Sequence, residues 1–368
     1  IFEKFFDKNP KWQKFYKKYK SPKISFLLGS VIVALHILGT KKEQLSYWNK
    51  IGTILGGTAG FAFLKMIEED AIKDHLNKIL FVARDGYTLK AMFETFNTSI
   101  NSEYVYAPRL VHTFFKYKNK TANKDDITLI ENFTKEYNRN TTLSIDAIVS
   151  KYLEEYSDYI KSIDINEKCG IVDSNSSSFS AKKLIDIESG FDNIGYYYSI
   201  LSENYDKKTH KSFYSNNKNY SYGQFIEFLM SSPEKPILLI ENLKPVYQEK
   251  LSTGDQFCID VYPQIYEGML EYAKYISTIN EIDLSFGEKE VKILFEFFEK
   301  NPTEEDETYM SNIKNGIDPL NKISIPVFPK WNKKCIKLWG IPIYTVQESS
   351  RYIKHKFLGI TFKREGKQ

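Results

Sequence analysis

The chain has little arginine, cysteine or histidine. Five of its 51 basic residues are arginines, and the formal net charge is only +4. The three cysteines and five histidines lie far apart, without the paired spacing of a structural zinc site or an HExxH helix. We therefore expect no disulfide framework, no zinc site and no nucleic-acid partner, and we expect a reducing, cytoplasmic compartment.

Long hydrophobic runs are also scarce. The N-terminal apolar run, residues 24–39, has 16 residues and is interrupted by Ser30 and His36, whereas a spanning helix needs roughly 20. We predict a buried helix here. The alternative is a peripheral contact of residues 11–39 with the inner face of the cytoplasmic membrane, because lysines alternate with aromatics in KWQKFYKKYK. The following run, IGTILGGTAGFAFLKMI, carries glycines where close helix packing would need them.

The remaining composition is that of a globular protein. With 368 residues, 42% hydrophobic and 27% charged, the chain is long enough for one large domain or two coupled ones. Its first residue is Ile, so we expect that a further segment precedes it in a longer protein.

Strand and helix patterns alternate after residue 78, which predicts a mainly parallel sheet with helices on both faces. The expected strands are 79–83, 103–109, 169–172, 194–201 and 236–241. The expected helices are 87–96, 180–187, 222–231, 262–278 and 287–299.

Four parts follow from this pattern. We expect a helical N-terminal segment (1–75) and an α/β core (76–123 and 164–300). The stretch 124–163 is polar and helical, and we expect it to be a cap-like insertion over the strand ends. In the C-terminal extension (301–368), KLWGIPIY and KFLGITFK repeat one pattern at a 19-residue offset, which predicts two short strands forming a hairpin.

Two of the predicted strands end in aspartate. In ILFVARDGYTLK the apolar run leads to Asp85, and in KCGIVDSNSSSF it leads to Asp173. Because ligand sites of parallel sheets form at the carboxyl ends of the strands, these carboxylates are candidate catalytic residues and Mg²⁺ ligands. Each has an ordinary alternative, since Asp85-Gly86 can be a simple turn and Asp173 a helix cap.

Basic and hydroxyl side chains near the same strand ends suggest an anion site. The serine-rich stretch 174–178 precedes a helix whose N-terminus would favour a phosphate. Arg84 and Arg109 can bind phosphate through the guanidinium fork, which lysine does not reproduce. The candidate phosphate-binding serines are Ser174, Ser176, Ser177 and Ser178.

FVARDGYTL resembles the first motif of the haloacid-dehalogenase (HAD) superfamily, a strand ending in Asp-x-Asp-Gly-x-Thr. It is closer to a divergent branch that reads Ala-Arg-Asp-Gly-Tyr and occurs in capsule and surface-polysaccharide loci of Campylobacter-like bacteria, often fused to glycosyltransferases. Other segments that resemble this branch cover about 45–280 and the tail: YWNKIGTILGGTAGFAF, YVYAPRL, VDSNSSS, FLMSSPEKPI, YEGMLEYAKYI and LWGIPIY…FLGITFK.

The resemblance implies a HAD-like (Rossmannoid) fold but an altered chemistry. Its general acid-base aspartate aligns with Asp85, and its phosphate-attacking aspartate aligns with Ala83. A methyl group cannot form an aspartyl-phosphate, so ordinary HAD phosphatase turnover is disfavoured. The resemblance offers Lys182 or Lys183 as the motif-three lysine, and the fourth, acidic motif has the candidates Glu241, Asp255 and Asp260.

Two functions remain open at this stage. The first is Mg²⁺-dependent phosphoryl transfer in polysaccharide biosynthesis without an aspartyl nucleophile, including ATP-driven activation of a sugar carboxylate for amide formation. The second is a catalytically inactive module that docks a glycan or a glycosyltransferase, which the resemblance leads us to expect in the same longer chain. A glycosyltransferase activity of these residues is a weaker third reading, because the sequence has no Asp-x-Asp nucleotide-sugar signature.

Overall fold

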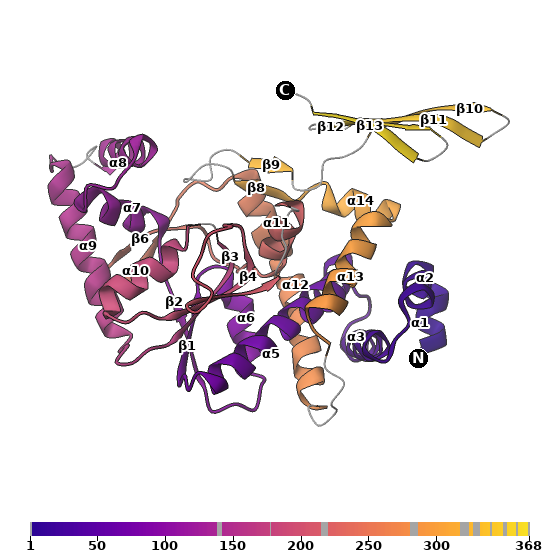
Figure 1. Ribbon diagram of the computed structural model, residues 1–368, viewed down its shortest axis with the longest axis horizontal. Helices are drawn as coiled ribbons and strands as arrows, with labels where there is room; N and C mark the ends of the chain where they lie inside the picture. The colour runs from indigo at the N-terminus through magenta and orange to yellow at the C-terminus, as the bar shows by residue number, and fades with distance from the viewer. Residues whose placement is uncertain are drawn as a thin grey trace.

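A computed structural model gives the fold of the chain (Figure 1). The residues it describes are 2–137, 142–176, 178–214, 220–279, 286–316, 324–326, 332–338, 341–348, 352–357 and 360–366.

The centre of the molecule is a five-stranded sheet in which every pairing is parallel. The strand order is β2-β1-β3-β4-β5, the doubly wound order in which β1 and β3 are neighbours although the chain leaves them in opposite directions. The strands are β1 (Lys78–Val82), β2 (Asn101–Val105), β3 (Gly170–Ser176), β4 (Ile194–Ile200) and β5 (His210–Tyr214). The predicted α/β class with a mainly parallel sheet is confirmed.

Helices cover both faces of this sheet, because the apolar side chains of β1 point alternately to one face and the other. Ile79 and Phe81 belong to one hydrophobic core and Leu80 and Val82 to the other. The helices are α5 (Thr58–Lys73), α6 (Gly86–Phe93), α11 (Tyr220–Leu229), α12 (Thr253–Ser277) and α13 (Glu288–Lys300) on the first face, and α7 (Arg109–Lys118), α8 (Lys124–Tyr137), α9 (Ile145–Ser162) and α10 (Ser180–Ser189) on the second.

The N-terminal segment is helical and packs on the first core. It comprises α1 (Phe2–Lys8), α2 (Pro10–Tyr19), α3 (Pro22–Thr40), α4 (Tyr47–Ile51) and a π-helical turn η1 (Gly52–Gly57) that runs into α5. Nine of the 19 residues of α3 are buried, so the expected helix forms and about one face of it packs in the protein. By length and composition α3 and the 27-residue stretch Tyr47–Lys73 could each cross a membrane, but 89% of the second one's apolar window lies inside the protein.

The glycines of η1 allow a close approach of α12. A Cβ at Gly52 would lie 2.4 Å from the carbonyl oxygen of Ile265, and a Cβ at Gly268 would lie 2.4 Å from that of Asn49. Real Cβ atoms do not approach backbone that closely, so only glycine fits at either crossing. The close helix packing predicted from the sequence is confirmed.

Residues 124–163 form two helices with different surroundings. The start of α8 borders the pocket described below, whereas α9 buries seven residues, among them Tyr152 and Tyr156, in the second hydrophobic core. The longer helix therefore covers the sheet, and only the first turns of α8 extend over the strand ends.

Three strands of the structure differ from the sequence expectation. The strand at 236–241 forms as β6 (Ile237–Glu241), but it pairs antiparallel with β7 (Lys244–Tyr247) outside the parallel sheet. The edge strand β5 was not expected, because HKSFY lacks an apolar run. The segment 103–109 ends as a strand at Val105, and Arg109 instead begins α7.

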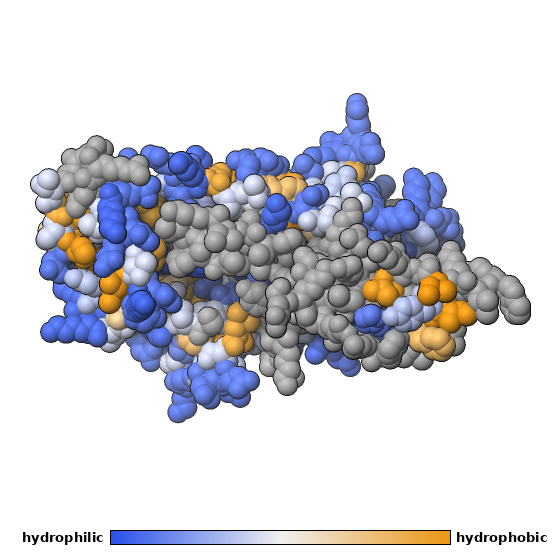
Figure 2. Space-filling view, turned by 90° about the horizontal axis from the view of Figure 1, so that it is seen from above, coloured by the Kyte–Doolittle hydropathy of each residue, from blue (hydrophilic) through white to orange (hydrophobic). Residues whose placement is uncertain are grey.

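The C-terminal extension holds more strands than the predicted hairpin. After α14 (Glu304–Met310) and the short pair β8 (Lys314–Gly316) and β9 (Ser324–Pro326) come β10 (Asn332–Leu338), β11 (Ile341–Glu348), β12 (Tyr352–Phe357) and β13 (Ile360–Gly366). The last four form one antiparallel sheet, drawn apart from the parallel sheet in Figure 1. Each sequence repeat spans the end of one strand and the start of the next, so the two repeats contribute to four strands. Figure 2 shows apolar side chains on this sheet, where Ile336 and Phe357 are 66% and 52% exposed.

Candidate functional site

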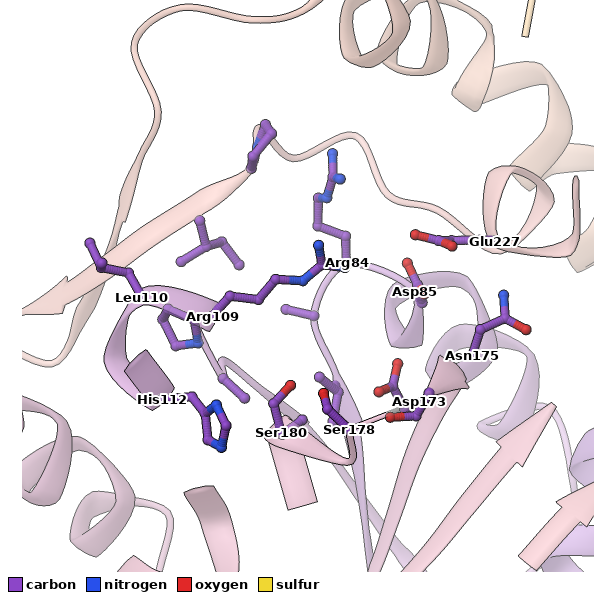
Figure 3. A pocket seen from close by; sticks show the side chains of 18 of the residues that line it. Arg84, Asp85, Arg109, Leu110, His112, Asp173, Asn175, Ser178, Ser180 and Glu227 are labelled. Carbon is purple, nitrogen blue, oxygen red and sulfur yellow. The ribbon is translucent and has the colours of Figure 1, made fainter. Parts of the chain in front are cut away.

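A pocket of about 690 Å³ opens at the carboxyl ends of β1 and β3. This is the point where the strand order reverses, and open α/β sheets bind their ligands there because the two flanking loops diverge. The walls come from the residues after β1 and within β3, from the first turns of α7, α8, α10 and α12, and from one face of α11. Figure 3 shows the side chains that face this space.

Three carboxylates meet on one side of the pocket (Figure 3). Asp85 follows β1, Asp173 lies in β3, and Glu227 comes from α11. Burial raises the pKa of Asp173 to about 7, and the charge of Glu227 adds to this shift. Burial, followed by the charges of Glu227 and Asp173, raises the pKa of Asp85 well above its usual value. Ionising all three groups at once is energetically unfavourable unless a cation lies beside them.

The two aspartates are held by a single serine. The Ser174 hydroxyl donates a hydrogen bond to Asp85, and the Ser174 amide donates to Asp173 Oδ1 at 2.9 Å. Ser174 is fully buried and lies behind the pocket wall. The structure therefore places Ser174 apart from the phosphate-binding candidates that line the pocket, and its contacts fix the two carboxyl groups.

Ala83 lies on the pocket wall directly before Arg84 and Asp85. Its amide donates a hydrogen bond of 2.9 Å to the Val105 carbonyl, which extends the β1–β2 ladder to the rim of the site. The position that the resemblance aligns with a nucleophile thus lines the pocket and carries a methyl group.

The two arginines have different settings. Arg109 is exposed at the start of α7 and reaches into the pocket from the wall opposite the carboxylates (Figure 3), where its charge lowers the pKa of Asp173. Arg84 donates a hydrogen bond of 2.9 Å to Asp255 in the first turn of α12. Burial alone would lower the pKa of Arg84, but Asp255 outweighs it and the pKa is raised, so the guanidinium stays charged.

Some of the remaining candidate residues line the pocket, and others lie away from it. Ser176 and Ser178 line the pocket together with the first residues of α10, and Ser177 lies outside the described residues. Lys182, the candidate motif-three and phosphate-binding lysine, does not line the pocket. It is buried and donates to Asp186 at 2.5 Å and Asp192 at 3.0 Å, which places it away from the other phosphate-binding candidates.

Of the acidic candidates, Asp255 lines the pocket. Glu241 pairs with Lys151, and Asp260 accepts from Gln256, both away from the site. Glu227 was missed because it lies in a helix, FIEFLM, and only tertiary packing brings it to the strand ends.

The pocket can hold Mg²⁺ only with help from a ligand. Among the described residues, no group of three or more His, Cys, Asp or Glu side chains is arranged to bind a metal ion by itself. Mg²⁺ commonly takes one or two carboxylates and completes its shell with waters and substrate phosphates. Asp85 and Asp173 offer oxygen ligands of the right type for that arrangement.

Comparison with models of known protein families and with curated proteins finds no match for this chain. The class that the fold and the site define is a doubly wound α/β protein with an acidic pocket, flanked by arginines, at its topological switch point.

Proposed function

We propose that this pocket binds a phosphate-bearing substrate together with Mg²⁺ and carries out phosphoryl transfer without an aspartyl nucleophile. The observation that carries the proposal is the meeting of Asp85, Asp173 and Glu227 in a pocket that Arg109 enters from the opposite wall. Phosphoryl transfer depends mainly on positioning and charge neutralisation, which such an arrangement supplies.

Different residues of the chain would bind the cation and the phosphate. Asp85 and Asp173 would hold the cation, Arg109 would contact phosphate oxygens, and the N-terminus of α10 beside Ser178 would add backbone donors. Bound Mg²⁺ would supply neutralisation of the phosphate charge. Ala83 takes the position that the resemblance assigns to a nucleophile, and its small side chain leaves room on the pocket wall.

The substrate class follows from the resemblance to surface-polysaccharide proteins. ATP-driven activation of a sugar carboxylate fits Ala83 best, because the substrate's own oxygen attacks the γ-phosphorus and ADP leaves. An amine then attacks the activated carbonyl carbon, releases phosphate and loses a proton, which forms an amide. Neither step needs a nucleophile on the protein.

The test is turnover of ATP by the chain with Mg²⁺, a uronic acid and an amine, followed as ADP and amide formation. We expect turnover that depends on both substrates, is lost in Asp173→Asn, is retained in Asp158→Asn on the outer face of α9, and leaves no acid-stable phosphoprotein. Failure of ATP consumption with every sugar acid and sugar hydroxyl tried would contradict the proposal.

Ala83 also favours a second candidate, a HAD-like module that has lost catalysis and docks a glycan or a glycosyltransferase. This candidate predicts binding of an oligosaccharide or of the partner domain with no dependence on Mg²⁺. Isothermal titration with and without EDTA separates the two, since the enzyme requires the cation and the docking module does not.

A further inference from the structure

Gln224 is a buried amide for which the described part of the chain provides no hydrogen-bond partner. Its side chain is 4% exposed, and neither Oε1 nor Nε2 is bonded to any group of the described residues. Burying an amide in this way is unfavourable, so such groups are rare in folded proteins and call for a specific explanation.

Gln224 lies next to the proposed reaction centre. It lines the same pocket as Glu227 and lies three residues before it in α11, so both side chains project from the same face of the helix. The backbone of this helix also contacts β3, where the Asn175 Nδ2 donates a hydrogen bond of 2.8 Å to the Gly223 carbonyl.

Asn175 adds a further unused acceptor to this wall. It lines the pocket two residues after Asp173 in β3, on the same side of the strand. Its Oδ1 is buried and has no hydrogen-bond partner within the ranges that the structure describes. The wall formed by Gln224 and Asn175 therefore offers two unused acceptors and at least one unused donor beside the carboxylates.

We propose that Gln224 and Asn175 form a subsite for the hydroxyl groups of a sugar whose charged group occupies the carboxylate and arginine side of the pocket. A pair of neighbouring hydroxyls can donate to the two amide oxygens and accept from Gln224 Nε2, whereas the phosphate oxygens of a fully ionised phosphate only accept. This inference rests on the proposed function and names its substrate class, a sugar with a phosphate or carboxylate substituent.

The test compares three probes, inorganic phosphate, a hexose 1-phosphate and the free hexose, by isothermal titration with Mg²⁺. The wild type should bind the hexose phosphate more tightly. Gln224→Leu should weaken hexose phosphate binding by roughly 10-fold or more and leave inorganic phosphate unchanged, because only the sugar contacts are lost. Gln256→Leu, on the exposed side of α12, is the matched control and should bind all three probes as the wild type does.

Stability without ligand provides the second measurement. Gln224→Leu should melt no lower than the wild type, because it removes a buried amide that no other described residue hydrogen-bonds. A clear loss of stability would mean that the amide is bonded within the fold, and would overturn the subsite. Gln224→Met repeats the test with a more flexible side chain of similar size.

The outcomes separate the subsite from the proposed function. Equal hexose phosphate binding by wild type and Gln224→Leu overturns the subsite while inorganic phosphate binding still supports the phosphate site. Binding of a free hexose that depends on Gln224, without any phosphate binding, supports the subsite and removes the phosphoryl-transfer proposal. Binding of none of the three probes overturns both.

Discussion

Arg84 and Asp255 join the loop after the first strand to the first turn of α12, with 2.9 Å between Nη1 and Oδ1. The arginine side chain is 23% exposed and the aspartate 9%. This ion pair anchors the loop that carries Ala83 and Asp85, so Arg84 supports the site and at least one of its five donors is already used.

Loss of this ion pair should destabilise the protein. Asp255→Asn leaves the Arg84 charge largely buried without its carboxylate, and we expect the free energy of unfolding to fall by about 2 kcal/mol. Urea unfolding measures the change, with Asp260→Asn, at an exposed position of the same helix, as the control. An unchanged unfolding midpoint in Asp255→Asn would show that the pair does not anchor the loop.

The carboxylate cluster makes stability depend on pH. Because burial raises the pKa of Asp173 from 3.8 to about 7, the folded form keeps a proton that the unfolded chain has lost. This stabilisation is complete below pH 3.8 and is lost as the pH rises to about 7. Without Mg²⁺, Asp173→Asn should therefore melt higher than the wild type at pH 8, with a smaller difference at lower pH.

Melting curves of both proteins from pH 4 to pH 8 test this prediction, with Asp158→Asn as the exposed control. A lower melting temperature of Asp173→Asn at pH 8 would mean that the charged carboxylate is stabilised in the fold. Ionisation of Asp173 would then not carry the predicted cost in stability.

The resemblance to the HAD motif aligns Ala83 with the aspartate that attacks phosphorus. Restoring a carboxylate at this position is therefore predicted to give a gain of function. Ala83→Asp places a carboxylate on the pocket wall beside Asp85, and we expect weak Mg²⁺-dependent hydrolysis of p-nitrophenyl phosphate. Ala83→Asn, which has nearly the same shape but a far weaker nucleophile, should remain inactive. Equal rates in the two variants would count against an aspartyl mechanism and against the alignment.

The crossing of η1 and α12 predicts a large effect of one methyl group. Gly268→Ala would put a Cβ 2.4 Å from the Asn49 carbonyl, so the helices must separate, and we expect a loss of about 2 kcal/mol or more. Gly29→Ala is the control, because its Cβ would meet only Phe2 at 3.5 Å and alanine is the better helix former. Equal melting of the two variants would contradict the close packing.

The sequence predicted that Asp85 and Asp173 lie close together because the signals for these positions are local. Asp85 follows one apolar run and Asp173 ends another, and the parallel pairing of Ile79 with Gly170 brings the two runs side by side. The alternation of strands and helices also predicted the sheet and the helices on its two faces.

The pocket residues and the strand pairing that the sequence did not predict depend on contacts between distant segments. Glu227 and Gln224 are ordinary polar positions in a helix, and they become pocket residues only when α11 packs beside β3. Lys182 follows the serine stretch closely, but α10 turns it towards Asp186 and Asp192 on its own side of the sheet. β6 pairs with β7 because the chain reverses at Asn242 and Leu243, both with positive φ, where no glycine marks a turn.

The measurement that tests the central claim most directly is thermal stability of the chain with ATP, CTP, UDP-sugars and sugar phosphates, each with and without Mg²⁺. Binding to the folded state stabilises it by RT ln(1 + L/Kd) at free ligand concentration L, so the melting temperature rises with ligand concentration. We predict concentration-dependent stabilisation by a phosphate-bearing ligand that requires Mg²⁺ and is lost in Asp85→Asn. A melting temperature that none of these ligands changes, with or without Mg²⁺, would contradict a metal-dependent phosphate site in this pocket.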